Sequence, residues 1–139
     1  MPALIVGNWK MNGLGEDIAE IAAMAGSSAP KRGSGIWIAP PFTLIDRAVS
    51  VSAGAVKIGG QDCHGNAKVA HTGCVSAPML ADLGAGFVIV GHSERRRDNG
   101  ETDADVRAKA MAGRAAELEV ILCIGETQVQ RIYHLDRGY

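Results

Sequence analysis

Residues 70–96 read AHTGCVSAPMLADLGAGFVIVGHSERR and contain, in order, a polar loop, a short helix, a strand and a second polar stretch. Ser76 and Pro78 are typical of a helix start, and Gly84 is typical of a helix end. The run FVIV at residues 87–90 is short, rich in β-branched side chains and without polar alternation, which is typical of a strand buried in a parallel sheet. The polar stretch GHSERR follows at once, so we expect it at the carboxyl end of that strand.

The same alternation of apolar runs and helical periods extends along the whole chain. The predicted strands are residues 3–6, 35–39, 56–60, 87–90 and 120–124. Apolar stripes at helical spacing predict helices at residues 14–25, 45–49, 76–84 and 104–118. Thr43 is expected to cap the second of these helices, and the fourth is entered through Thr102 and Asp103. The order is βα four times, then a fifth strand and a short terminal helix, which requires the α/β class with parallel neighbours.

Two closures of such a sheet are possible, an open doubly wound sheet or part of an eight-stranded barrel, and the pattern alone does not choose between them. The absence of a GxGxxG after any predicted strand weakens the dinucleotide-binding version of the open sheet. No linker, low-complexity segment or shift in composition divides the chain. We therefore predict a single domain over residues 1–139.

The composition excludes several classes of function. Hydrophobic residues make up 47%, charged residues 21%, and the formal charge is −1, so nothing indicates binding to nucleic acid or to an anionic membrane. The one basic cluster, residues 95–97, is followed by Asp98 and Glu101, and we interpret it as a solvated turn. Neither a signal peptide nor a membrane span is expected. The odd number of cysteines, Cys63, Cys74 and Cys123, without CxxC spacing, indicates reduced thiols in a cytoplasmic protein.

The segments that end the predicted strands carry polar motifs. Besides residues 70–96 they read VGNWKMN (6–12), IAPPF (38–42), GGQDCH (59–64) and ILCIGET (121–127). Taken together, these motifs resemble the triosephosphate isomerase family, over residues 4 to about 131. The resemblance implies a (β/α)8 TIM barrel, here a partial one, whose active site lies on the loops at the carboxyl ends of the strands. It also implies interconversion of dihydroxyacetone phosphate and glyceraldehyde 3-phosphate, a step of glycolysis and gluconeogenesis, without a cofactor.

The resemblance assigns roles to individual residues. Lys10, with Asn8 beside it, would bind the substrate phosphate and stabilise the developing enediolate. His92 would polarise the substrate carbonyl as a neutral imidazole, and Glu94 and Cys123 match further positions near the site. A helical turn beginning beside His92 disfavours a charged ring, and a neutral ring can donate a hydrogen bond to a forming oxyanion. A carboxylate base paired with a neutral histidine is the known pattern of this family, which is itself the standard example of it.

Residues 61–76 resemble the long third loop through which subunits of the family dimerise. Gln61, Thr72 and Cys74 are assigned to this dimer loop, with Thr72 at its tip and reaching the other chain's site. Cys74 departs from the family, which usually has an acidic residue there. A second reading is a metal cluster formed by Cys63, His64, His71 and Cys74. The family's loop geometry is the favoured interpretation, and no metal is expected.

An eight-stranded barrel of this kind needs ~250 residues, and this chain has 139. We therefore expect strands six to eight to be missing, together with the family's glutamate base, its lid loop and its main phosphate loops. The remaining carboxylates Asp62, Glu94 and Glu126 have no evident reason to face the substrate carbon. The sequence predicts a truncated homologue with little or no activity. The alternatives are an active isomerase completed by a partner chain and a non-catalytic assembly or binding module.

Five strands of such a barrel leave two open edges and an inner face that we expect to consist of Ile, Val and Leu. Exposed edges and apolar patches favour association, so a homo-oligomer is expected. Two copies would bring ten strands, so a dimer does not simply rebuild an eight-stranded barrel. Residues 128–135 have helical apolar spacing (Val129, Ile132, Tyr133, Leu135), and the prediction is an ordered tail that buries Ile132 and Leu135 at an association interface.

Overall fold

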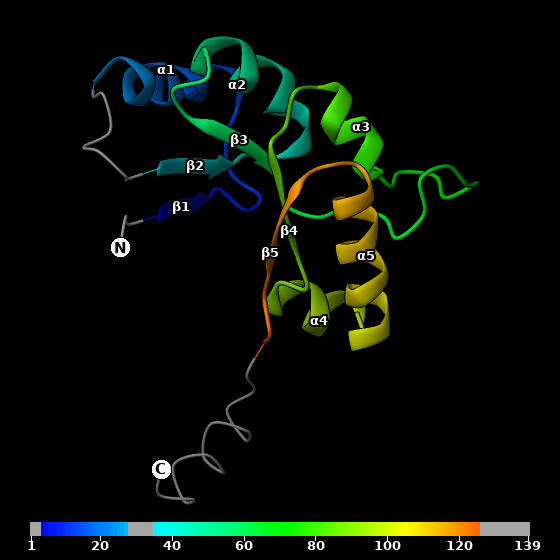
Figure 1. Cartoon of the computed structure of the whole chain (residues 1–139). Helices are drawn as coiled ribbons and strands as arrows, with labels where there is room; N and C mark the ends of the chain where they lie inside the picture. The colour runs from blue at the N-terminus through cyan, green and yellow to red at the C-terminus, as the bar shows by residue number, and fades with distance from the viewer. Residues whose placement is uncertain (1–3, 28–34, 126–139) are drawn as a thin grey trace, which may run out of the picture.

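The computed structural model describes residues 4–27 and 35–125. Figure 1 shows the elements, which alternate between strands and helices as expected. In chain order they are β1 (Leu4–Asn8), the 3-10 turn η1 (Gly15–Asp17), α1 (Ile18–Ser27), β2 (Gly35–Ala39), the 3-10 turn η2 (Phe42–Leu44), α2 (Ile45–Ser52), β3 (Lys57–Gly60), α3 (Ala77–Asp82), β4 (Phe87–Val90), α4 (Ser93–Asn99), α5 (Asp103–Ala115) and β5 (Glu119–Leu122).

The five strands form one parallel sheet in the order β1-β2-β3-β4-β5, so each strand pairs with its neighbours in the chain. The sheet curls, and Figure 1 shows β4 and β5 turned steeply away from the direction of β1 and β2. Helix α2 contacts β3, and α5 contacts both β4 and β5. The opposite, concave face has its own small apolar cluster, in which strand residues pack on one another. This arrangement is a half-barrel, and it decides against the doubly wound alternative, in which helices cover both faces.

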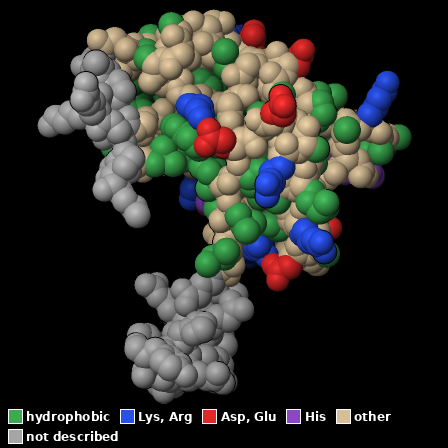
Figure 2. Space-filling model, viewed as in Figure 1, with side chains coloured by type: hydrophobic (Ala, Val, Ile, Leu, Met, Phe, Trp, Pro, Cys, Tyr) green, Lys and Arg blue, Asp and Glu red, His purple; other side chains and the backbone are tan. Residues whose placement is uncertain are grey.

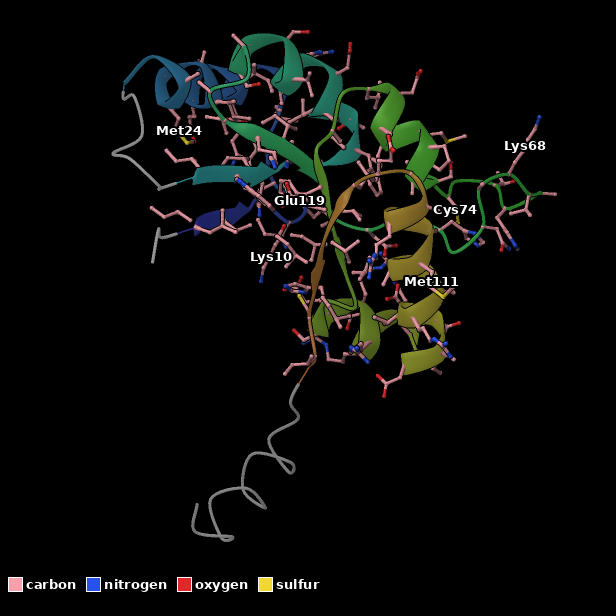
Figure 3. The ribbon with its side chains drawn as sticks, viewed as in Figure 1. Lys10, Met24, Lys68, Cys74, Met111 and Glu119 are labelled. Atoms are coloured by element: carbon pink, nitrogen blue, oxygen red, sulfur yellow. The ribbon has the colours of Figure 1, made fainter. Side chains whose placement is uncertain are left out.

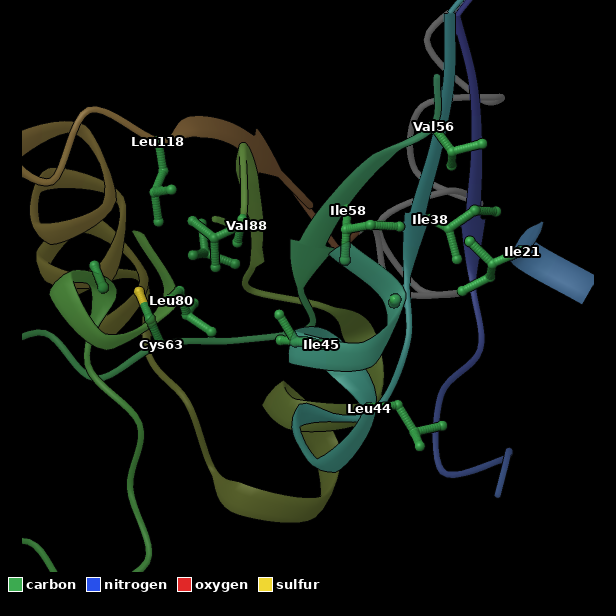
Figure 4. Close-up of a cluster of buried hydrophobic side chains, with 14 of the residues drawn as sticks. Ile21, Ile38, Leu44, Ile45, Val56, Ile58, Cys63, Leu80, Val88 and Leu118 are labelled. Carbon is green, nitrogen blue, oxygen red and sulfur yellow. The ribbon is translucent and has the colours of Figure 1, made fainter. Parts of the chain in front are cut away.

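The main core lies between the convex face of the sheet and the helices. Figure 4 shows Ile38, Ile58 and Val88 on the strands facing Ile45 and Leu80 on the helices, all of them buried. Helix α3 begins where predicted, because the Ser76 hydroxyl accepts the Met79 backbone N–H at the start of the helix. The packing therefore follows from the apolar stripes of the helices and the β-branched runs of the strands.

The concave face differs from the prediction of an Ile, Val and Leu lining. Phe87 and Ala39 are fully buried there, and the Trp37 ring packs on Phe87 at a centroid distance of 5.0 Å. A Cβ at Gly59 would lie 2.4 Å from the Phe87 ring, so the aromatic side chain occupies the space over this glycine. Two of the few aromatic residues thus fill the centre of the face, and it is less exposed than expected.

The outer strands remain open among the described residues. β1 and β5 each have one neighbouring strand, and apolar side chains at these edges are exposed, with values of 50% for Leu4, 61% for Ile5 and 54% for Leu122. Figure 2 shows apolar side chains reaching the surface next to charged ones on the face that it presents. The prediction of two open apolar edges is confirmed for the part of the chain that the structure describes.

Several predicted boundaries were wrong. β1 runs on to Asn8 because its ladder with β2 continues past the apolar run, and β5 begins at Glu119 and ends at Leu122. Thr43 caps nothing: it lies inside η2, which begins after Pro41, and α2 follows without a side-chain cap. Thr102 does cap α5, since its hydroxyl accepts the Asp105 backbone N–H. The predicted tail at residues 128–135 and Glu126 lie outside the described residues.

The basic cluster at residues 95–97 is not a solvated turn. It belongs to α4, a helix of seven residues with no apolar stripe. Arg95 pairs with the carboxylates of Asp62 and Glu101, and Arg96 donates to the carbonyl oxygens of Gly91 and Cys123. Arg97 alone of the three matches the expectation, because it is exposed and paired with its neighbour along the helix.

Within the described ranges, none of the helices is both long and apolar enough to cross a membrane.

Candidate active site

The polar motifs of the sequence meet at the carboxyl ends of the strands. A cavity of about 300 Å³ opens there, between the ends of β1, β3 and β4. It is lined by Asn8, Lys10, Met11, Phe42, Gln61, Asp62, His92, Glu94, Arg95, Asp98 and Asn99. The structure therefore brings together four of the five predicted catalytic residues, and Cys123 is the one that does not line the cavity.

Lys10 is held in an unusual backbone conformation. Its φ is +54°, in the left-handed region that a lysine seldom occupies. Its backbone N–H donates to Asn8 Oδ1 at 2.8 Å, and its carbonyl oxygen accepts from Gln61 Nε2 at 2.8 Å. The same Gln61 nitrogen also donates to the Ala39 carbonyl at 2.9 Å. Side chains from β1 and from the end of β3 thus fix the turn that presents the Lys10 ammonium group.

His92 caps the N-terminus of α4. Its Nδ1 accepts the Glu94 backbone N–H at 3.2 Å, and the imidazole is largely buried. A nitrogen that accepts a hydrogen bond carries no proton, so this contact favours the neutral ring with its proton on Nε2. The helical turn expected beside this histidine is present, and in this tautomer the ring would have an Nε2–H to donate.

Lys10 and Glu94 form an ion pair across the cavity, with 2.6 Å between Nζ and Oε1. The hydrogen bond from Lys10 is the main cause that lowers the pKa of the Glu94 carboxyl, so this group is ionised at neutral pH. Both side chains are half-exposed. Part of the positive charge that Lys10 offers to an anion is therefore balanced within the chain.

Cys123 follows β5 and belongs to the cluster on the concave face. Burial raises the pKa of its thiol, against a smaller opposing effect of Arg96. A raised pKa keeps the thiol protonated, and a protonated thiol is a poor nucleophile. Cys123 packs against the concave-face cluster, and its assignment to the site remains a prediction.

The sequence model described as triosephosphate isomerase matches residues 3–135. The chain belongs to the triosephosphate isomerase family. It is 56% identical over 128 residues to the triosephosphate isomerase of Ruegeria sp. (strain TM1040), covering 92% of this chain and 51% of that protein. It is 55% identical over 130 residues to that of Afipia carboxidovorans, covering 92% of this chain and 52% of that protein.

A solved structure agrees with the fold. The triosephosphate isomerase of Bartonella henselae superposes with a TM-score of 0.88 at 43% identity, covering 96% of this chain and 56% of that one. The chain therefore spans about half the length of the relatives it matches. The curled five-stranded sheet corresponds to part of the barrel of the triosephosphate isomerase family.

The loop assigned to dimerisation projects from the body of the half-barrel. Figure 3 shows Lys68 at its outer end and Cys74 nearer to the helices. Thr72 and Cys74 are exposed. Gln61 lies at the base of the loop, and its contacts described above are with its own chain, in the site cavity. The roles of Thr72, Cys74 and Gln61 in a triosephosphate isomerase dimer remain predictions.

The structure does not support the alternative interpretation of residues 63–74 as a metal cluster. Cys63 is buried, and its Sγ contacts the Lys109 carbonyl at 3.6 Å, inside the core. The His64 and His71 rings pack on each other with centroids 4.4 Å apart. No group of three or more His, Cys, Asp or Glu side chains among the described residues is arranged to hold a metal ion.

A buried charge cluster beneath the site was missed by sequence reasoning. Lys109 of α5 donates to Asp62 at 2.8 and 2.9 Å and to Glu101, and Arg95 joins both carboxylates. Burial raises the pKa of Asp62, against the hydrogen bond and charge of Lys109. Burial also acts on Glu101, but the hydrogen bonds from Lys109 and Arg95 outweigh it and lower the pKa of that carboxyl. Arg95, Glu101 and Lys109 lie within one stretch of the chain, but Asp62 is 47 positions from Lys109, so no local pattern indicates that the four groups meet.

Proposed function

We propose that the 139-residue chain holds the carbonyl-polarising and cationic half of a triosephosphate isomerase site and has little or no isomerase activity by itself. One observation carries the proposal. Each carboxylate that lines the cavity is paired with a cation of the same chain: Glu94 with Lys10, Asp62 with Lys109 and Arg95, and Asp98 with Arg97. Among the described residues that line the cavity, no carboxylate is free to act as the base.

His92 is the group that would polarise the substrate. Its Nε2–H would donate to the carbonyl oxygen of the triose as that oxygen gains negative charge. A donor already fixed in place stabilises such an oxyanion without reorganising, and loss of one donor of this kind commonly costs about 10²- to 10³-fold in rate. The Nδ1 contact with the α4 backbone supports this role, because it fixes both the ring and its tautomer.

Lys10 is the group that would attract the phosphate and the developing enediolate. Its strained turn, held by Asn8 and Gln61, directs the ammonium group into the cavity. The Lys10 ammonium group has three N–H donors, so it can bind an anion while it stays paired with Glu94. We propose this shared contact as the binding step.

The missing part is the base. Isomerisation removes a proton from the carbon beside the carbonyl, and the acceptor must come within ~3 Å of it. Glu94 is a weak base because Lys10 lowers the pKa of its carboxyl, and Asp62 is occupied by Lys109. A positioned base contributes roughly 10²- to 10⁴-fold, and phosphate binding and lid closure contribute further.

A coupled isomerase assay tests this proposal. The purified chain should give no rate above that of its His92→Ala variant at the same concentration. Equal small rates in both would identify a host enzyme as their source and agree with the proposal. A rate near that of a full-length relative, abolished by His92→Ala, would contradict it.

A second candidate is an isomerase completed by further strands from another polypeptide segment. The observation that favours it is the pair of open edges, at which Ile5, Leu122 and Ile124 are exposed at 61%, 54% and 82%. Such a segment would pair with β1 and β5 and could bring a carboxylate and a phosphate site. A rate that appears only when that segment is added would support this candidate.

Self-association is proposed on the same edges and on the projecting loop. Val69 of the loop is exposed at 50%, which is comparable to the exposure of the edge residues. Exposed edges and apolar patches favour association, as noted for the sequence. We propose that the chain is a homo-oligomer in the cytoplasm and that its ligand is a small phosphorylated triose.

A further inference from the structure

Lys57 makes contacts on the concave face that no part of the proposed chemistry uses. It is the first residue of β3, and its ammonium group forms an ion pair with Glu119, the first residue of β5. Figure 3 marks Glu119 at this end of β5. The ammonium group also lies over the Trp37 ring of β2, 4.3 Å from the ring centroid. The Lys57 side chain therefore reaches from β3 to side chains of β2 and β5, and it passes over the residue that precedes β4.

A glycine provides the room for this crossing. Gly86 lies just before β4, and a Cβ on it would come within 2.9 Å of Lys57 Cγ and 3.0 Å of Lys57 Cδ. The backbone of Gly86 is bonded on both sides, since its N–H donates to the Ile58 carbonyl at 2.8 Å and its carbonyl accepts the Glu119 N–H at 3.1 Å. The lysine stem thus lies against the sheet backbone where three strands meet.

We propose that Lys57 forms a cross-sheet strap, meaning its ion pair with Glu119 together with its contact with the Trp37 ring. This strap maintains the curvature of the open sheet and keeps the free edge of β5 in place for the addition of a strand. β5 is bonded to β4 on one side only among the described residues, so its other edge has no backbone hydrogen bonds to a strand there. The strap ties β5 to β2 and β3 without using β4 as an intermediate. The proposal concerns the fold and stands whether or not the chain is an isomerase.

Hydrogen exchange of the full chain, read by mass spectrometry, tests the strap. Lys57→Met keeps an apolar stem over Gly86 but removes the ammonium group from Trp37 and Glu119. Because exposed ion pairs and cation–π contacts are individually modest, exchange in residues 119–123 should speed up about threefold to thirtyfold. Residues 4–8 and 35–39 should keep their rates. Arg97→Met, which removes an exposed ion pair within α4, is the matched control and should change neither segment.

Two further variants keep the test decisive if Lys57→Met folds poorly. Gly86→Ala displaces the lysine stem without changing any charge, and Glu119→Gln removes the acceptor's charge but keeps its size. Both should speed up exchange in residues 119–123 selectively. The proposal is overturned if these variants change residues 119–123 no more than Arg97→Met does, or if exchange rises equally in all five strands.

Discussion

Two carbonyl groups and one side-chain amide decide where the Lys10 ammonium group lies. Lys10 has a left-handed backbone, which costs a non-glycine residue about 1–3 kcal/mol. Gln61 stabilises this conformation by donating to the carbonyls of Lys10 and Ala39. Sequence reasoning placed Gln61 in the dimer loop, because its part in holding Lys10 depends on a contact between residues 51 positions apart.

Replacing Gln61 by Ala should lower the free energy of unfolding by about 1–2 kcal/mol, because two carbonyls lose their donor and one of them is partly buried. Urea denaturation measures this change. Asn12→Ala is the matched control, since the Asn12 amide donates a single exposed hydrogen bond to the Trp9 carbonyl, and its loss should cost less than about 0.5 kcal/mol. Equal midpoints for Gln61→Ala and the native chain would show that the amide does not support the turn.

Cys63 should make stability depend on pH in the alkaline range. Burial, and then the charge of Asp62, raises the pKa of its thiol from 9.0 to about 11. Between these values the unfolded chain loses the thiol proton and the native chain keeps it. Stability is therefore fully present below pH 9 and falls as the pH rises toward 11, by about 2–3 kcal/mol, because each pKa unit corresponds to about 1.4 kcal/mol. Cys63→Ala should remove this component, and parallel pH profiles for the two chains would refute the assignment.

At the scale of elements, α4 is a helix that hydrophobic periodicity in the sequence does not reveal. A helical turn was expected beside His92, but the sequence SERRRDN has no apolar stripe, so hydrophobic periodicity does not predict the full seven-residue helix. The helix exists because His92 caps it, Gly100 ends it in a left-handed conformation, and two of its arginines contact distant groups. By contrast, α3 and α5 were predicted with their capping residues, Ser76 and Thr102, because their signals are local.

The strands likewise have features that the sequence predicted and features that it did not. The five apolar runs predicted five strands and their parallel order, and these are confirmed. The concave face was predicted with an Ile, Val and Leu lining, and its aromatic centre was missed because the packing of Trp37 on Phe87 depends on the register of β2, β3 and β4. At the site, the resemblance identified Asn8, Lys10, His92 and Glu94 as neighbours, while the Asp62 and Lys109 contact required the fold.

The charge cluster that joins α4 to α5 should contribute to stability. Glu101→Gln should lower the free energy of unfolding by about 1–3 kcal/mol, because the Glu101 side chain is 7% exposed and binds both Arg95 and Lys109. Since the pKa of Glu101 is lowered, this contribution is present above pH 4.5 and is lost as the pH falls further. The native chain and the variant should therefore converge in acid, as thermal unfolding at several pH values would show.

Asp98→Asn is the control for this cluster, because its ion pair with Arg97 is exposed. It should change stability much less than Glu101→Gln does, because solvent screens an exposed ion pair. A similar loss in both variants would mean that burial of the Glu101 cluster does not matter. A Glu101→Gln effect that persists unchanged in acid would show that the lost charge is not the cause.

At the scale of the whole molecule, the open edges and the projecting loop predict association. Light scattering coupled to size exclusion should give at least twice the 14.5 kDa of one chain at micromolar concentration. Val69→Lys charges the loop and Ile5→Lys charges the β1 edge, and both side chains are exposed in the single chain. The variant that lowers the mass identifies the surface responsible. A well-folded native chain with the mass of one copy would refute the prediction.

The most direct experiment is to supply the part of the family's length that this chain does not span. The chain would be mixed with a separately produced segment of the Ruegeria sp. (strain TM1040) relative, covering the part of that protein beyond the 51% that this chain matches. Co-elution confirms binding, and a coupled assay then measures isomerisation. The account predicts a rate that requires both components and is lost with His92→Ala. A bound complex without activity would contradict the claim that this chain supplies a competent His92 and Lys10.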